Sequence, residues 1–209
     1  MYTLYGDLRS GSSIIELLLS HLQISYNTIR IDLEKNAQRD SSYLTVNPQG
    51  KLPCLVKNDG QALTETVAIL VHLLENHAQS SSLLPPIGIA ERDTAWRWLL
   101  YVATEIYPLV EINDYPERFC AHTELTEETR EVARELWRKR WSLVEQQISG
   151  NPFLLPSGLC VTDFYIAVVS RWAQQDHWRR KHLPKVENIA EAVATLPGCD
   201  AVWTKHFPN

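Results

Sequence analysis

The sequence of 209 residues lacks the short motifs that mark the common nucleotide-binding proteins and serine hydrolases. It contains no G-x-x-x-x-G-K-[ST], no G-x-G-x-x-G and no G-x-S-x-G segment. Its seven histidines show no metal-ligand spacing, so we expect no metal site. Its four cysteines are scattered without a C-x-x-C pair, which favours reduced thiols in a cytoplasmic protein.

A large charge of one sign and a long apolar stretch are also missing. The formal net charge is -5, and the only dense basic cluster, Arg179-Arg180-Lys181, is too short for a nucleic-acid surface. We interpret that cluster as a solvated helix end. No stretch is apolar enough to cross a bilayer, and the opening MYTLYG does not resemble a signal peptide. We therefore expect a cytoplasmic protein that binds neither nucleic acid nor a membrane.

Tryptophan and phenylalanine are absent from the first 90 residues, whereas all seven tryptophans and all four phenylalanines follow. This asymmetry predicts two separate cores. The polar run Gln79 to Ser82 and the helix-breaking residues up to Gly88 are typical of a linker. The sequence thus predicts one domain over residues 1–80 and a second over residues 90–209.

The first half alternates strand and helix patterns in the order β-α-β-α-β-β-α. Right-handed crossovers would make the first strands parallel, and the Asp-Gly of residues 57–60 predicts a final antiparallel hairpin. The fold expected is therefore an α/β domain with a small mixed sheet. The predicted strands span 2–6, 26–31, 52–56 and 61–63, and the predicted helices span 14–22, 37–45 and 65–77.

The second half shows only helical periodicity and predicts an all-α helical bundle. The predicted helices span 90–107, 127–148, 162–178 and 186–196.

Three segments of the first half carry candidate functional residues. The first is the stretch Asn47-Pro-Gln-Gly-Lys-Leu-Pro53. Because proline cannot donate to a strand ladder and only about 5–6% of X-Pro bonds are cis, residue chemistry alone favours an ordinary edge strand with a trans Pro53.

The second segment, Leu63-Thr-Glu-Thr-Val-Ala-Ile69, passes from a strand directly into a helix. One interpretation is an ordinary helix start, capped by Thr64 and with Glu65 favoured by the helix dipole. The other uses the same geometry to bind an α-amino acid end group. Thr66 and its N–H would hold the carboxylate and Glu65 would pair with the ammonium.

The third segment is the loop from Tyr5 to Ser13 that connects the first strand and the first helix. Ser13 and Glu16 have the spacing of a capping box, in which each satisfies a backbone N–H of the helix start. Ser10 and Ser12 would then be left to face a ligand.

In this order the serine loop, N-P-x-G-K-L-P-x-L and L-T-E-T-x-A-I resemble the N-terminal domain of the glutathione transferase superfamily. The stretch Gly158 to Asp163 is similar to the helix-capping motif of that family's second domain, with Cys160 at the usual position of serine or threonine. We expect this cap to be weaker or shifted to Thr162.

The resemblance implies a thioredoxin-like first domain that binds glutathione as co-substrate. Leu52-Pro53 would be cis, and the Leu52 backbone would bind the cysteinyl part of glutathione like an added strand. Glu65 and Thr66 would hold the γ-glutamyl end. Lys51 is the nearest cation for the glycyl carboxylate, with Arg39 and Gln49 as alternatives.

The implied reaction is attack of the glutathione thiolate on an electrophile. Ser10, Ser12 and Tyr5 are the candidate donors to the thiolate, and the sequence does not choose among them. Because no cysteine lies in this loop, a mixed-disulfide mechanism is disfavoured.

The second domain would line the second-substrate pocket with residues of its first helix, and the family resemblance implies a homodimer. Two other functions keep the same fold: a glutathione-dependent disulfide-bond reductase or peroxidase, and a non-catalytic glutathione-binding or partner-binding module. The candidate pocket residues are Trp98, Tyr101, Glu105 and Tyr107.

Overall fold

The computed structural model describes residues 1–173 and 175–208, which form two compact units. The first comprises residues 1–83 together with residues from Val193 onward, and the second comprises residues 84–192. The division at residue 83 falls within the expected linker. The segment from Val193 differs from the sequence-based expectation of a second domain over residues 90–209, because it packs in the first unit.

A four-stranded mixed sheet lies at the centre of the first unit, in the order β2-β1-β3-β4. β1 and β2 are parallel, whereas β3 pairs antiparallel with both β1 and β4. The β3–β4 turn closes with hydrogen bonds between Lys57 and Gln61 and between Gly60 and Lys57. The sheet confirms the predicted strand directions, and its strands are β1 (Tyr2–Gly6), β2 (Tyr26–Arg30), β3 (Cys54–Val56) and β4 (Ala62–Thr64).

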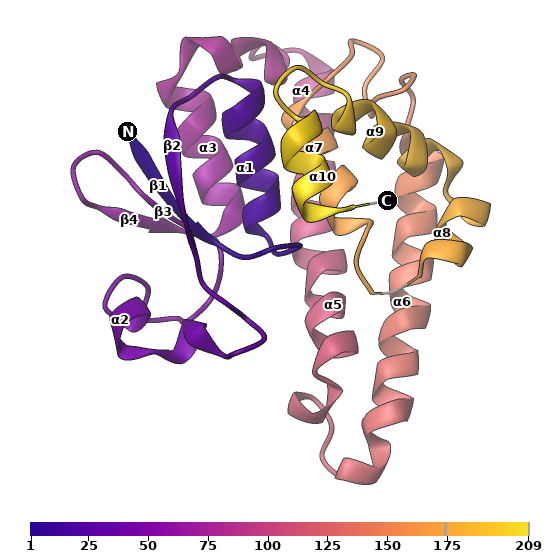
Figure 1. The fold of residues 1–209 in the computed structure, drawn as a ribbon. Coiled ribbons are helices and arrows are strands. Elements are labelled where there is room, and N and C mark those ends of the chain that lie inside the picture. Colours follow the sequence, from indigo (N-terminus) through magenta and orange to yellow (C-terminus); the bar gives the residue numbers. More distant parts are fainter. Residues whose placement is uncertain (174, 209) are drawn as a thin grey trace. The chain divides into compact units, whose positions relative to one another are not determined.

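Helices α1 (Ser12–His21) and α3 (Thr66–Asn76) pack side by side against this sheet (Figure 1). Every residue of α1 from Ser12 to Leu19 is buried, whereas a helix on a sheet ordinarily keeps one polar, solvated face. The additional cover is α10 (Asp200–His206), which packs against α1. This buried second face explains why the C-terminal segment belongs to the first unit.

The approach of that segment to α1 requires a glycine. Gly198 has φ +80, and a Cβ at this position would lie 2.4 Å from the Ser20 carbonyl oxygen.

The helix expected over residues 37–45 is interrupted. It forms a 3-10 turn, η1 (Ala37–Arg39), and a single α-helical turn, α2 (Ser41–Leu44), because Asp40 between them is extended with ψ 143. A further 3-10 segment, η2 (Ala78–Leu83), follows α3.

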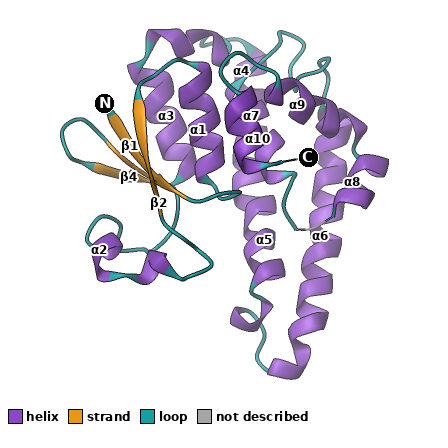
Figure 2. Cartoon of the chain, in the orientation of Figure 1, coloured by secondary structure: helices purple, strands orange, loops and turns teal. Residues whose placement is uncertain are grey.

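The second unit contains helices and 3-10 turns, and no strand was assigned among its described residues (Figure 2). The first expected helix continues beyond residue 107, because a π-helical segment, η3 (Val102–Ile106), joins α4 (Ala90–Tyr101) to α5 (Tyr107–Asp114). The remaining elements are η4 (Pro116–Arg118), η5 (Thr123–Leu125), α6 (Thr126–Gln147), α7 (Val161–Val169), α8 (Asp176–His182) and α9 (Pro184–Ala194), whose end crosses the boundary at residue 192.

The helix expected over residues 162–178 is wrong as a single element. α7 ends at Val169 and α8 begins at Asp176, and between them Ala173 has φ +63, a left-handed conformation that an α-helix does not contain. Gln174, which also falls in the expected helix, lies outside the described residues.

Tryptophans of α6 form part of the second core, in line with their absence from the first 90 residues. Trp137 and Trp141 have no exposed surface, and their ring centroids are 5.9 Å apart.

A buried cap fixes the start of α7. The Asp163 carboxylate accepts the N–H of Leu154 and of Cys160, both at 2.8 Å, and burial raises the pKa of Asp163 to about 6. Cys160 occupies the cap position in a complete capping box. Thr162 instead donates its hydroxyl to the Ala95 carbonyl at 2.9 Å, so the expected shift of the cap to Thr162 is wrong.

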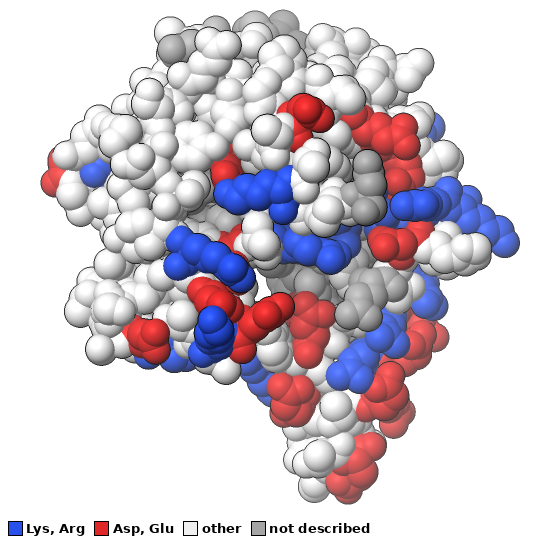
Figure 3. All heavy atoms as spheres, viewed as in Figure 1, with Lys and Arg blue, Asp and Glu red and all other residues white. Residues whose placement is uncertain are grey.

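The basic cluster at residues 179–181 is only partly a solvated helix end. Arg180 and Lys181 are exposed, but Arg179 is 2% exposed and pairs with Glu187 and Asp176. On the face shown in Figure 3, basic side chains lie among acidic ones. Over the described residues, no helix is long and apolar enough to span a membrane, and no group of histidine, cysteine and acidic side chains has the arrangement of a metal site.

Candidate functional site

The register of the sheet brings the three candidate segments to one edge. Tyr5 pairs with Cys54, and Cys54 pairs with Thr64. Because β3 runs opposite to β1 and β4, the end of β1, the start of β3 and the end of β4 lie side by side. The serine loop, the residues before Cys54 and the start of α3 therefore meet at this edge.

The segment before β3 offers free backbone groups. The Leu52–Pro53 peptide bond is cis, and Pro53 is buried. Leu52 is half-buried, and no hydrogen bond of its N–H or C=O was found among the described residues. An extended ligand that reached this edge would pair with both groups, as an added strand does.

Two side chains fix the neighbouring Lys51 carbonyl by hydrogen bonds. It accepts the Tyr43 hydroxyl at 2.7 Å and the Asn47 side-chain amide at 2.8 Å. Burial raises the pKa of Tyr43 to about 12, so this phenol stays protonated and remains a donor. The Lys51 side chain itself is exposed.

The start of α3 has a strained backbone. Glu65 is the N-cap residue at φ 64 and ψ 114, a region that non-glycine residues seldom occupy and that costs about 1–3 kcal/mol. No hydrogen bond of a described side chain caps this helix, so Thr64 does not act as the cap. The Glu65 side chain is exposed and Thr66 is buried. The edge thus combines an accessible carboxylate with helix-start N–H groups, which favour an anionic ligand.

Ser10 and Ser12 form a closed network with the Asp7 carbonyl oxygen. Their hydroxyl oxygens are 2.8 Å apart, and they lie 2.9 Å and 3.2 Å from that oxygen. The two hydroxyl hydrogens therefore already have acceptors within these three contacts. A hydroxyl would have to rotate about its C–O bond before it could donate to a thiolate. Ser10 is the more accessible of the two, because it is half-buried whereas Ser12 is 2% exposed.

Tyr5 lies in β1 beside this loop. It is half-buried, and its ring centroid is 5.7 Å from that of Tyr43.

The expected capping box of Ser13 and Glu16 is wrong. The Ser13 hydroxyl lies 3.0 Å from His206 Nδ1, and Glu16 pairs with Lys205 and with His206, each at 2.7 Å. The start of α1 is satisfied by Ser10 instead, whose carbonyl accepts the Ser13 N–H. Sequence reasoning missed His206 and Lys205, since they are about 190 residues from their partners and carry no local motif.

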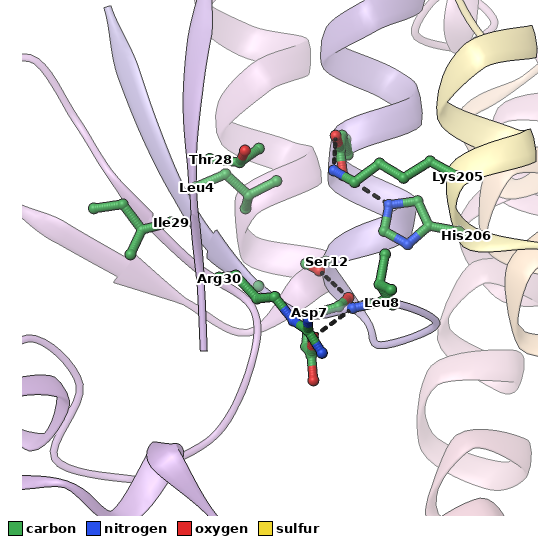
Figure 4. A pocket seen from close by; sticks show the side chains of 11 residues that line it. Leu4, Asp7, Leu8, Ser12, Thr28, Ile29, Arg30, Lys205 and His206 are labelled. Carbon is green, nitrogen blue, oxygen red and sulfur yellow. Dashed lines mark hydrogen bonds and ion pairs between the residues drawn. The ribbon is translucent and has the colours of Figure 1, made fainter. Parts of the chain in front are cut away.

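A pocket of about 60 Å³ lies in the first unit between β2, α1 and α10 (Figure 4). Lys205 and His206 point into it from α10, opposite Asp7 and Arg30. Its lining includes Ser12 but none of Leu52, Pro53, Glu65 and Thr66. The pocket therefore shares the serine loop with the sheet edge but does not reach the residues before Cys54 or the start of α3.

The four residues expected to face a second substrate lie in α4, η3 and α5 of the second unit. Trp98 is 3% exposed, and Arg97 lies 4.7 Å above its ring. Glu105 pairs with Arg140 at 2.9 Å. The Tyr101 ring contacts Trp98, and the Tyr107 ring contacts Trp172 at 4.8 Å.

Comparison with known proteins supports the resemblance of the first half. The family model described as "Glutathione S-transferase, N-terminal domain" matches residues 1–75. The chain is 27% identical over 207 residues to the "Uncharacterized GST-like protein YncG" of Escherichia coli K12, covering 99% of this chain and 98% of that protein. It is 28% identical over 186 residues to "Glutathione S-transferase GstA" of Escherichia coli O157:H7, covering 86% and 89%.

Among solved structures, a glutathione transferase homologue from Sulfitobacter with bound glutathione has a TM-score of 0.89. It shares 22% sequence identity and covers 98% of each chain, a likeness that shows the fold. The family model identifies residues 1–75 as a glutathione S-transferase N-terminal domain, and the two bacterial relatives resemble the chain along most of its sequence.

Proposed function

We propose that this protein binds glutathione at the sheet edge of its first unit and transfers the glutathione thiolate to a small electrophile. The observation that carries the proposal is the start of α3, where Glu65 is exposed in a strained conformation in front of a helix without a side-chain cap. Strain of this kind is retained where function needs the geometry. The glutathione bound to the Sulfitobacter homologue supports the same ligand here.

Each part of glutathione has a matching group at this edge. The γ-glutamyl ammonium would pair with Glu65, and its carboxylate would accept hydrogen bonds from Thr66 at the start of α3. The cysteinyl part would pair with the N–H and C=O of Leu52 as an added strand. Lys51 would neutralise the glycyl carboxylate, with Arg39 and Gln49 as the alternatives.

The serine loop would stabilise the thiolate. A free thiol has a pKa near roughly 8.5, so only a few per cent is ionised at neutral pH. A hydrogen bond to a charged group contributes about 1.5–3 kcal/mol, which corresponds to one or two pKa units. In the reaction, the thiol proton passes to water and the sulfur lone pair forms the new S–C bond. The leaving group departs with its bonding electrons.

Replacement of Glu65 tests the binding site. Glu65→Ala should weaken glutathione binding by at least about 2 kcal/mol, roughly 30-fold in Kd, because the ligand ammonium loses its partner. Isothermal calorimetry measures this change. Glu75→Ala is the matched control, since Glu75 is an exposed glutamate near the other end of α3. Equal affinities of the two folded variants would place the ligand elsewhere.

The identity of the thiolate donor is tested by titration. Ultraviolet titration of bound glutathione in Ser10→Ala, Ser12→Ala and Tyr5→Phe should show a rise of about one pKa unit for the variant that removes the donor. We expect the largest rise for Ser10→Ala, because Ser10 is the more accessible serine. A shift in Tyr5→Phe alone would assign the role to Tyr5 and refute the serine assignment.

A non-catalytic glutathione-binding module is the second candidate function. It is favoured by the engaged hydroxyl hydrogens of Ser10 and Ser12, which already have acceptors within the loop. Turnover of aryl halides supports the transferase, and turnover of mixed disulfides or peroxides alone supports a reductase or peroxidase. Tight glutathione binding with no turnover of any of the three supports the binding module.

We also propose a homodimer, as the family resemblance implies. Light scattering at micromolar concentration should give about twice the 24.0 kDa of one chain. A mass of one chain would refute it.

A further inference from the structure

A buried histidine of α10 accepts a hydrogen bond from the backbone of the serine loop. His206 is 2% exposed, and each of its ring nitrogens has a defined partner. Nδ1 accepts the backbone N–H of Arg9 at 3.2 Å and lies 3.0 Å from the Ser13 hydroxyl. Nε2 lies 2.7 Å from a carboxylate oxygen of Glu16.

These partners determine where the imidazole carries its proton. The Arg9 N–H can only donate, so Nδ1 must offer its lone pair. The proton then resides on Nε2 and is donated to Glu16. Glu16 is also held by Lys205, and together these contacts fix both the tautomer and the orientation of the ring.

The order Ser13, His206, Glu16 is also the order of hydrogen bonds in a serine hydrolase triad. Two observations exclude that role here. Ser13 has no exposed surface, so a substrate does not reach its hydroxyl. The Nδ1 lone pair that would act as the base is already shared with the Arg9 N–H.

The hydrogen bond from the Arg9 N–H to His206 Nδ1 stabilises a strained position of the loop. Arg9 has φ +57, a left-handed conformation that costs a non-glycine residue about 1–2 kcal/mol. The other end of the loop is fixed at Asp7, whose buried carboxylate accepts Arg30 Nε at 2.7 Å and the Leu33 N–H at 2.8 Å. Ser10 follows Arg9 directly and Ser12 is three residues after Arg9, so the two anchors set their positions.

We infer that His206 is a positioning residue for thiolate activation, because its Nδ1 holds Arg9 and thereby keeps Ser10 and Ser12 in place. The inference rests on the proposed function of the loop as donor to glutathione. It assigns a part in that function to a side chain of the C-terminal segment, far from the glutathione-contacting motifs in sequence.

Two isosteric variants separate the two sides of the imidazole. His206→Asn keeps an acceptor near the position of Nδ1, but its side chain is too short to donate to Glu16. His206→Gln keeps a donor near the position of Nε2 and loses the acceptor for Arg9. Both variants should lower the stability of the protein, but only His206→Gln should break the hydrogen bond that anchors Arg9. Lys205→Met is the matched control, because it removes a partner of Glu16 without touching Arg9.

For His206→Gln we expect the pKa of bound glutathione to rise by about one unit and kcat to fall about tenfold, with the KM for glutathione unchanged. Hydrogen exchange of the Arg9 N–H should also accelerate about tenfold or more. His206→Asn and Lys205→Met should stay near wild type in all of these measurements. A merely structural role would instead affect the Asn and Gln variants alike, and that result would overturn the inference.

A further measurement needs no variant. Scalar coupling between the Arg9 amide nitrogen and His206 Nδ1 in the wild-type protein should be detectable by NMR, and its absence would refute the anchor even if the Gln variant did not fold. The exchange and coupling experiments are made without glutathione, so they decide the anchor separately from the proposed function. If wild type fails to lower the thiol pKa while the anchor is detected, the proposed function fails and the role of His206 in activation fails with it.

Discussion

Glycine and alanine at position 65 should differ in their effect on stability and have the same effect on binding. Glu65 has φ 64 and ψ 114, and alanine would inherit the strain of this conformation while losing the carboxylate. Glycine reduces the clash because it has no Cβ. The strain costs the folded state about 1–3 kcal/mol. The greater freedom of glycine in the unfolded chain offsets about 0.5–1 kcal/mol of what glycine gains by relieving it.

The net expectation is that Glu65→Gly is more stable than Glu65→Ala by about 1 kcal/mol, or about 2–4 °C in Tm for a chain of this length. Denaturant midpoints at constant m value measure the difference, and calorimetry with glutathione shows whether both variants lose affinity equally. If Glu65→Ala is as stable as Glu65→Gly or more so, the backbone at residue 65 is not strained, and the reasoning that connects strain to function fails.

Two further predictions concern buried carboxylates. Asp163→Ala should cost about 2–6 kcal/mol in the free energy of unfolding, because two buried N–H groups lose their acceptor; an unchanged denaturant midpoint would contradict the cap. Burial disfavours the Glu16 carboxylate, but hydrogen bonds from His206 and Lys205 outweigh it and lower its pKa. Its stabilisation is therefore complete above the unfolded pKa of about 4.3 and is lost as pH falls through the lower folded value. Glu16→Gln should flatten the acid-unfolding curve in that range, and an unchanged curve would contradict the pairing.

Most of the first unit could be predicted from local patterns. The strand directions follow from the alternation of strand and helix signals and from the Asp-Gly turn, and the start of α3 follows from the polar triplet after Leu63. These features depend on residues close in sequence. The cis Leu52–Pro53 bond was expected only from the family resemblance, because residue chemistry alone favours trans.

The serine loop shows what local patterns miss. Ser13 and Glu16 match a capping box, yet both side chains turn to His206 about 190 residues away. The buried Glu16 carboxylate accepts hydrogen bonds from His206 Nε2 and from Lys205, and these tertiary contacts outweigh the local motif. Arg179 is a similar case, because its burial depends on Glu187 in the next helix and not on its basic neighbours.

The return of the C-terminal segment to α1 has a consequence for synthesis of the chain on the ribosome. Residues 84–192 form an uninterrupted unit, whereas the first unit needs α10, which is made after all of them. During translation, the face of α1 that carries Ser13 and Glu16 therefore stays uncovered until α10 emerges. The first unit, although synthesised first, can complete its core only after the whole second unit has left the ribosome.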